Sequence, residues 1–216
     1  MIKGAIFDMD GTLLDSMPAW RSTASRYVKS LGMVPQEGLD ENIRHKSMAE
    51  AAEYINMHHK LRKTPKEIQA GVIDAMAQFY ENEVECKPGV EEFLHQLKEQ
   101  GVKLWIATAT DRPLVNLALE RTKIAHYFDA IFTCSEVGRG KAAPDIYEQA
   151  LAFLGTKKEE TYVFEDACYA AVTAHKADFP VVAIYDKYEP EQKVLKRQAQ
   201  YYVEDTMGLG DILSLL

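Results

Sequence analysis

The sequence predicts an α/β protein built on a doubly wound, mainly parallel sheet, with a small α-helical domain inserted after the first strand. Over residues 85–216, short apolar runs alternate with segments of helical periodicity, which is typical of a parallel sheet covered by helices on both faces. Residues 16–84 show helical periodicity and no strand pattern. We therefore place the core domain at residues 1–15 and 85–216 and the helical domain at residues 16–84.

The chain opens on a strand. Residues 2–7 form a short apolar run, and Gly11 breaks the extended pattern soon after it. Apolar residues then recur every three to four positions up to residue 31, and Gly32 follows as a stop signal. This pattern predicts one helix over residues 16–31.

Two further helix starts in the helical domain have the form of a capping box. Residues 47–50 read Ser-Met-Ala-Glu and residues 64–67 read Thr-Pro-Lys-Glu. In this pattern the first and fourth side chains satisfy backbone N–H groups at the beginning of a helix. Pro65 falls at the first helical position, where the missing N–H costs nothing.

The core domain continues the alternation of strand and helix. Strands are expected at residues 102–107, 130–133, 161–164, 181–184 and 201–203. Helices are expected at residues 90–97, 112–123, 144–154, 167–177 and 189–199, with a last helix after the final strand.

Composition excludes several classes of partner. The formal net charge of −8 argues against broad contact with nucleic acid or an anionic membrane. No apolar run approaches the roughly 20 residues of a membrane span, and the first residues lack a signal-peptide pattern. The three cysteines have no metal-ligand spacing and are expected to be reduced thiols. We expect a cytoplasmic protein with no obligatory protein partner.

Two aspartates, Asp8 and Asp10, follow the first strand with only Met9 between them. Residues two apart on an extended chain point the same way, so both carboxylates begin on one face. Close carboxylates repel each other unless a cation or a shared proton compensates. The pair indicates a divalent metal site or acid–base chemistry, and the competing interpretation is an ordinary Asp-Gly turn.

Other polar residues follow later strands. Thr108 ends one strand, Lys141 lies in the glycine-rich loop after the next, and Glu165 with Asp166 follows a third. In open α/β sheets, ligands bind beyond the carboxyl ends of the strands. We therefore expect these four side chains to lie near Asp8 at one edge of the sheet.

Residues 7–16 resemble the first motif of the haloacid dehalogenase-like (HAD) hydrolase superfamily, most closely its phosphoglycolate phosphatase and β-phosphoglucomutase-like branch. Thr108, residues 140–145 and residues 164–166 are similar to the second, third and fourth motifs of that family, in the same order. The resemblance implies a Rossmann-like HAD core and a helical cap over residues 16–84. Ala142 departs from the proline usual in the third motif, and we expect a looser loop there.

The resemblance also implies the metal and the catalytic residues. Mg²⁺ would be held by Asp8, the backbone carbonyl of Asp10, Asp166 and Glu165, the last directly or through water. Asp8 would attack phosphorus and become an aspartyl-phosphate. Asp10 would protonate the leaving alcohol and then take a proton from the hydrolytic water.

Thr108 and Lys141 would bind the phosphate oxygens and stabilise the charge that spreads over them in the transition state. Each has a neighbour that offers similar chemistry. Thr110 is the alternative for the hydroxyl, and Arg139 is the alternative for the cation. We rank both alternatives below the first choice.

The implied activity is Mg²⁺-dependent hydrolysis of a small phosphorylated metabolite, such as a sugar phosphate or phosphoglycolate. The alternative is a β-phosphoglucomutase-like mutase, but such enzymes carry a histidine ten residues after the second aspartate of the first motif, where this chain has Trp20. Dehalogenase relatives lack the second aspartate and the metal. A non-catalytic binding protein would have no need of repelling carboxylates.

Some polar residues of the helical domain receive no role. His58 and His59 are consecutive, so they cannot face one metal from a helix, and we interpret both as part of a solvated face. Arg44 and Lys46 are left as possible contacts for an anionic substrate, outside the candidate site.

Overall fold

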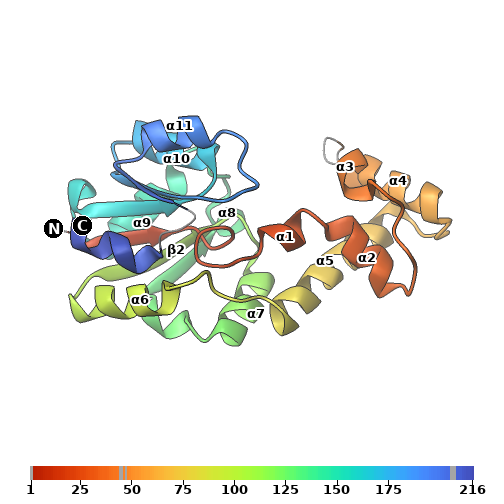
Figure 1. The fold of residues 1–216 in the computed structure, drawn as a ribbon, viewed down its shortest axis with the longest axis horizontal. Coiled ribbons are helices and arrows are strands. Elements are labelled where there is room, and N and C mark those ends of the chain that lie inside the picture. The colour runs from red at the N-terminus through yellow and green to blue at the C-terminus, as the bar shows by residue number, and fades with distance from the viewer. Residues whose placement is uncertain (1, 44–45, 47, 205–207) are drawn as a thin grey trace. The chain divides into compact units, whose positions relative to one another are not determined.

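The computed structural model describes residues 2–43, 46, 48–204 and 208–216 (Figure 1). The chain divides into two compact units. We call Met1–Asp15 with Glu85–Leu216 the core unit, and Ser16–Val84 the helical unit. Among the described residues, none of the helices combines the length and the apolar character that a membrane span requires.

The core unit is built on one six-stranded sheet with the order β3-β2-β1-β4-β5-β6 (Figure 1). All its strand pairs are parallel, which confirms the predicted sheet type. The strands are β1 (Gly4–Phe7), β2 (Lys103–Thr108), β3 (Ala130–Thr133), β4 (Thr161–Glu165), β5 (Val181–Ile184) and β6 (Tyr201–Val203). The order reverses at β1, so the crevice beyond β1 and β4 is the place where such sheets bind ligands.

Helices cover both faces of the sheet, as the apolar strands predict. They are α6 (Val90–Glu99), α7 (Arg112–Thr122), α8 (Cys134–Val137), α9 (Asp145–Leu154), α10 (Cys168–Lys176) and α11 (Gln192–Gln198). Short 3₁₀ segments add η1 (Ala125–Tyr127), η2 (Lys158–Glu160) and η3 (Leu209–Leu215). The helices α10 and α11 lie on one face, and α6 and α7 lie on the other (Figure 1).

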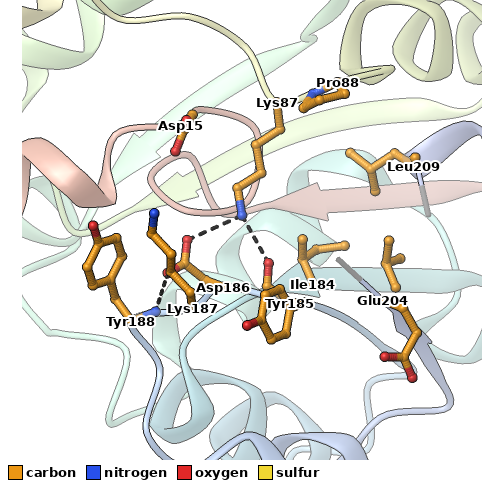
Figure 2. A pocket seen from close by; sticks show the side chains of 12 residues that line it. Asp15, Lys87, Pro88, Ile184, Tyr185, Asp186, Lys187, Tyr188, Glu204 and Leu209 are labelled. Atoms are coloured by element: carbon orange, nitrogen blue, oxygen red, sulfur yellow. Dashed lines mark hydrogen bonds and ion pairs between the residues drawn. The ribbon is translucent and has the colours of Figure 1, made fainter. Parts of the chain in front are cut away.

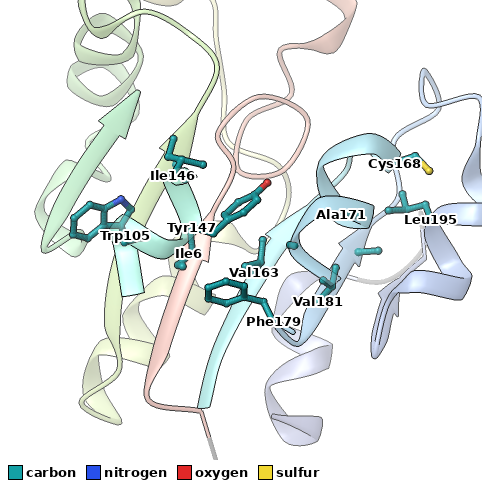
Figure 3. Close-up of a cluster of buried hydrophobic side chains, with 14 of the residues drawn as sticks. Ile6, Trp105, Ile146, Tyr147, Val163, Cys168, Ala171, Phe179, Val181 and Leu195 are labelled. Atoms are coloured by element: carbon teal, nitrogen blue, oxygen red, sulfur yellow. The ribbon is translucent and has the colours of Figure 1, made fainter. Parts of the chain in front are cut away.

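Successive side chains of β1 serve opposite faces of the sheet. Ile6 packs with Trp105, Val163 and the buried side of α9 and α10 (Figure 3). The next residue, Phe7, stacks on Phe164 with ring centroids 4.3 Å apart on the other face. Because β1 is buried on both sides, its end is held rigidly.

The helical unit contains α1 (Met17–Trp20), α2 (Thr23–Ser30), α3 (Leu39–Ile43), α4 (Met48–His59) and α5 (Pro65–Asn82) in its described residues. The capping box at the start of α5 is confirmed, since Thr64 N–H donates to Glu67 at 2.7 Å and Glu67 N–H donates to Thr64 at 3.3 Å. The predicted box at residues 47–50 includes Ser47, which lies outside the described residues, as does Arg44.

Several local predictions were wrong. The single helix expected over residues 16–31 is broken into α1 and α2, and the carboxylate of Asp40 accepts the N–H groups of Ala24 and Ser25 at the start of α2. The short helix α8 was missed, and the last helix is the 3₁₀ segment η3. The start of α2 is thus capped by a side chain from a distant segment, and such a cap leaves no signal in the local sequence.

His59 is a further correction, because it is buried while His58 is exposed. Its Nε2 accepts the N–H of Gln36 at 3.1 Å, and its Nδ1 lies 3.2 Å from the carbonyl of Ile55. The imidazole therefore ties the loop after α2 to α4. A histidine that bonds two backbone groups is satisfied inside a protein.

Gly71 of α5 offers a test of packing in the helical unit. A Cβ at this position would lie 2.2 Å from Cε2 of Tyr27, whose side chain is buried on α2. Alanine normally stabilises a helix by about 1 kcal/mol relative to glycine, but overpacking costs about 1–3 kcal/mol. We expect Gly71→Ala to lower the midpoint of urea unfolding.

The matched control is the same change in a Tyr27→Leu background, where the ring is gone. There Gly71→Ala should be neutral or stabilising. A rise in the unfolding midpoint for Gly71→Ala in the natural background would contradict the packing argument.

Candidate active site

The carboxyl ends of β1 and β4 bring the acidic residues together. The two strands pair in register, Phe7 beside Phe164, and Asp8 N–H donates to the carbonyl of Phe164 at 2.9 Å. Asp8 is the first residue after β1. Glu165 is the last residue of β4, and Asp166 follows it. Acidic side chains 157 and 158 residues apart in the chain therefore meet at the reversal point of the sheet.

Asp8, Glu165 and Asp166 form an acidic cluster in which each offers a carboxylate oxygen, all within 4.8 Å of one another. Glu165 is fully buried and Asp166 is 4% exposed. The cluster does not include the carboxylate of Asp10. The metal contact expected for Asp10 is through its backbone carbonyl, which this cluster of side-chain oxygens does not test.

Lys141 is the cation of the cluster. Its Nζ lies 2.6 Å from Oδ1 of Asp8 and 2.5 Å from Oε1 of Glu165, and its side chain is 2% exposed. Burial alone would lower the pKa of Lys141, but the charges of Asp8 and Glu165 outweigh it and hold the pKa well above its usual value. The ammonium is therefore charged. Tyr147 also donates to Glu165, at 3.2 Å.

The loop after β1 wraps around Asp166. Gly11 has φ of +80°, and a Cβ there would lie 2.2 Å from Oδ2 of Asp166, so only glycine fits. Thr12 donates its hydroxyl to Oδ1 of Asp166 at 2.9 Å. The role of Thr12 as a partner of Asp166 could not be predicted from the sequence, in which Gly11 and Thr12 mark only the end of a strand, because the two residues lie 154 positions apart.

The two threonines after β2 have different partners. Thr108 is buried, and its Oγ1 accepts the N–H of Thr110 at 3.1 Å. Thr110 donates its own hydroxyl to Oδ2 of Asp10 at 2.7 Å. The hydroxyl of Thr108 thus retains its proton for another acceptor, whereas that of Thr110 is directed at Asp10.

Arg139, the alternative cation, lies outside the cluster. Its side chain is 68% exposed, and its Nε is 3.7 Å from Asp145. The buried contacts of Lys141 therefore favour Lys141 as the cation of the site.

The charge balance of the site fits a divalent cation. Burial raises the pKa of Asp8 from 3.8 to about 7 although Lys141 opposes the rise, and the neighbouring carboxylates add to it. Burial and the charges of Asp8 and Glu165 hold the pKa of Asp166 well above its usual value. Three carboxylates thus face one ammonium, and oxygen donors of this kind suit a hard divalent ion.

A cavity of about 330 Å³ lies beyond the ends of β5 and β6 in the same unit (Figure 2). Its lining includes none of the predicted site residues. Lys87 projects into it and donates to the carbonyl of Tyr185 at 3.1 Å and to Asp186 at 3.3 Å (Figure 2). Because Asp186 already pairs with this cation, we assign the cavity no phosphate.

Comparison with known proteins agrees with the geometry. The family model of the haloacid dehalogenase-like hydrolases matches residues 5–184. Hexitol phosphatase A of Escherichia coli is 30% identical over 197 residues, which cover 84% of this chain and 82% of that protein. A phosphorylated carbohydrates phosphatase of Thermotoga maritima is 28% identical over 166 residues, 77% of each chain.

Among solved structures, a candidate β-phosphoglucomutase of Thermotoga maritima superposes with a TM-score of 0.83 at 25% identity and covers 94% of each chain. The chain belongs to the haloacid dehalogenase-like hydrolase family. The expected enzyme class, a phosphohydrolase with a Rossmann-like HAD core, is confirmed by this match and by the phosphatases among the relatives.

The raised pKa of Asp8 predicts how metal binding depends on pH. Asp8 must lose its proton to act as a metal ligand, and its pKa is about 7. Because the pKa of Asp166 is also held above its usual value, metal affinity should rise with pH through the neutral range, by up to about tenfold per unit for each carboxyl that must lose a proton. Calorimetric titration with Mg²⁺ in buffers of different ionisation enthalpy would measure both the affinity and the protons released.

Asp8→Asn provides the control. The amide has no proton to lose, so this variant should release fewer protons on binding Mg²⁺ than the natural protein, and Asp166 remains as a source of release. Equal affinity of the natural protein at pH 6 and pH 8, with no proton release, would contradict the prediction.

Proposed function

We propose that the protein is a Mg²⁺-dependent phosphatase that hydrolyses a small phosphomonoester through an aspartyl-phosphate on Asp8. The observation that carries this proposal is the buried contact of Lys141 with Asp8 and Glu165 beside Asp166, at the reversal point of the sheet. Relatives named as phosphatases of hexitols and of phosphorylated carbohydrates support a sugar phosphate or a similar phosphorylated metabolite as substrate.

Asp8, Asp166 and the backbone carbonyl of Asp10 would hold Mg²⁺, with Glu165 beside them as a direct or water-mediated ligand. The ion would supply positive charge against the phosphate oxygens. Glu165 also bonds Lys141 and Tyr147, so it orients the ammonium as well.

In the first half of the reaction, a carboxylate oxygen of Asp8 attacks phosphorus and the bond to the leaving oxygen breaks. Lys141 lies close enough to Asp8 to contact the phosphoryl group, and Thr108 donates its hydroxyl proton to another phosphate oxygen. Asp10 gives a proton to the leaving oxygen. In the second half, Asp10 takes a proton from water as the water attacks phosphorus and releases Asp8.

We further propose that the core unit is the catalytic domain and that the helical unit is a cap that selects the substrate. Cytoplasmic location also stays a prediction, and the free thiols of Cys86, Cys134 and Cys168 are compatible with it.

Removal of the nucleophile tests the proposal. With p-nitrophenyl phosphate and Mg²⁺, Asp8→Asn should lower kcat by about 10³-fold or more, because an amide cannot form the covalent intermediate. Asp74 is an exposed carboxylate on α5, so Asp74→Asn should leave kcat unchanged. Turnover by Asp8→Asn at the natural rate would remove Asp8 as nucleophile.

The reaction products distinguish a phosphatase from a mutase, and one similar solved structure is a candidate β-phosphoglucomutase. Trp20 occupies the position at which the mutases that resemble this chain have a histidine. Its indole N–H donates to the hydroxyl of Tyr80 at 2.9 Å within the helical unit. Incubation with β-glucose 1-phosphate and a trace of the bisphosphate should therefore release free phosphate. Formation of glucose 6-phosphate without free phosphate would instead establish the mutase.

A further inference from the structure

The carboxylate of Asp10 is held from a neighbouring strand. Thr110 lies two residues beyond the end of β2, and its Oγ1 is 2.7 Å from Oδ2 of Asp10, 100 residues away in the chain. Because β1 and β2 are adjacent parallel strands, their following loops meet at the same edge of the sheet. The contact is short and partly shielded from water, since Thr110 is 8% exposed.

The segment that carries Thr110 is itself fixed at both ends. The N–H of Thr110 donates to Oγ1 of Thr108, which is 1% exposed at the end of β2. The next residue, Asp111, is the N-cap of α7, and its carbonyl accepts the N–H groups of Leu114 and Val115. A hydroxyl placed on such a rigid segment can fix the orientation of the carboxylate that it bonds.

We propose that Thr110 is a positioning residue that orients Asp10 for proton transfer, an inference that rests on the proposed acid–base role of Asp10. A hydroxyl has one proton to donate, and Thr110 gives it to Oδ2. Proton transfer then runs through Oδ1. In the first step Oδ1–H gives its proton to the leaving oxygen as the P–O bond breaks. In the second step Oδ1 takes a proton from the attacking water.

This role differs from phosphate binding, the alternative that the sequence leaves open for Thr110. A hydroxyl proton that is donated to Asp10 is not donated to phosphate at the same time. Loss of the Thr110 hydroxyl should therefore slow the chemical step, and it should do so more for a leaving group that depends more on protonation. Binding of phosphate should change little.

The experiment compares Thr110→Val and Thr110→Ser on two substrates, p-nitrophenyl phosphate and phenyl phosphate, with Mg²⁺ present. Phenol is the poorer leaving group and needs the proton more. For Thr110→Val we expect kcat/KM for phenyl phosphate to fall about 10- to 100-fold, as expected for a misplaced catalytic group. For p-nitrophenyl phosphate it should fall less than about threefold. Thr110→Ser should restore both rates.

Inhibition by inorganic phosphate is the second measurement. The inhibition constant of Thr110→Val should stay within about threefold of that of the natural protein. An equal loss for both substrates, together with weaker inhibition by phosphate, would make Thr110 a phosphate ligand and overturn the inference. If Thr110→Val does not fold, Thr110→Ala removes the same hydroxyl without placing a methyl group against Asp10, and the same two substrates are compared.

Asp10→Asn distinguishes the two levels of the argument. If Asp10→Asn lowers kcat/KM equally for both substrates, the proposed acid role of Asp10 is wrong, and the inference about Thr110 is wrong with it. If Asp10→Asn shows the leaving-group dependence and Thr110→Val does not, the proposed function stands and Thr110 has no positioning role.

Discussion

The site depends on the contact of one buried ammonium with carboxylates that repel one another. Lys141 lies 2.6 Å from Asp8 and 2.5 Å from Glu165, and Asp166 completes the acidic cluster. Burial of these charges is expensive, and a single ammonium offsets only part of the repulsion. Burial raises the pKa of Asp8 to about 7 against the opposing charge of Lys141, and the neighbouring carboxylates add to the rise, so a divalent cation suits the site.

The sheet supplies the stiffness that such an arrangement requires. Strands β1 and β4 are buried on both faces, and their parallel register sets Asp8 beside the end of β4. A close-packed strand cannot swing away to relieve the repulsion between its acidic end and that of its neighbour. The glycine at position 11 then lets the following loop approach Asp166 closely enough for Thr12 to bond it.

Much of this could be predicted from residue patterns. Apolar runs between helical segments specify a parallel sheet, and parallel strands end at a common edge, so Asp8, Lys141 and Asp166 were expected near one another. Side-chain partners could not be predicted in the same way. Asp40 at the start of α2, Gln36 on His59 and Thr110 on Asp10 are contacts between distant segments, and hydrogen bonds of this kind leave no periodicity in the chain.

Local periodicity and backbone geometry were enough to predict most of the strand-and-helix order, the buried apolar faces and the residue types at the carboxyl edge, but not α8 or the break between α1 and α2. The oxygen of Asp10 that is held, the threonine that holds it and the need for glycine at position 11 became clear from the folded structure alone. The reason is physical. A hydrogen bond or a close approach depends on positions known to a fraction of an ångström, and those positions are set by the packing of the whole core.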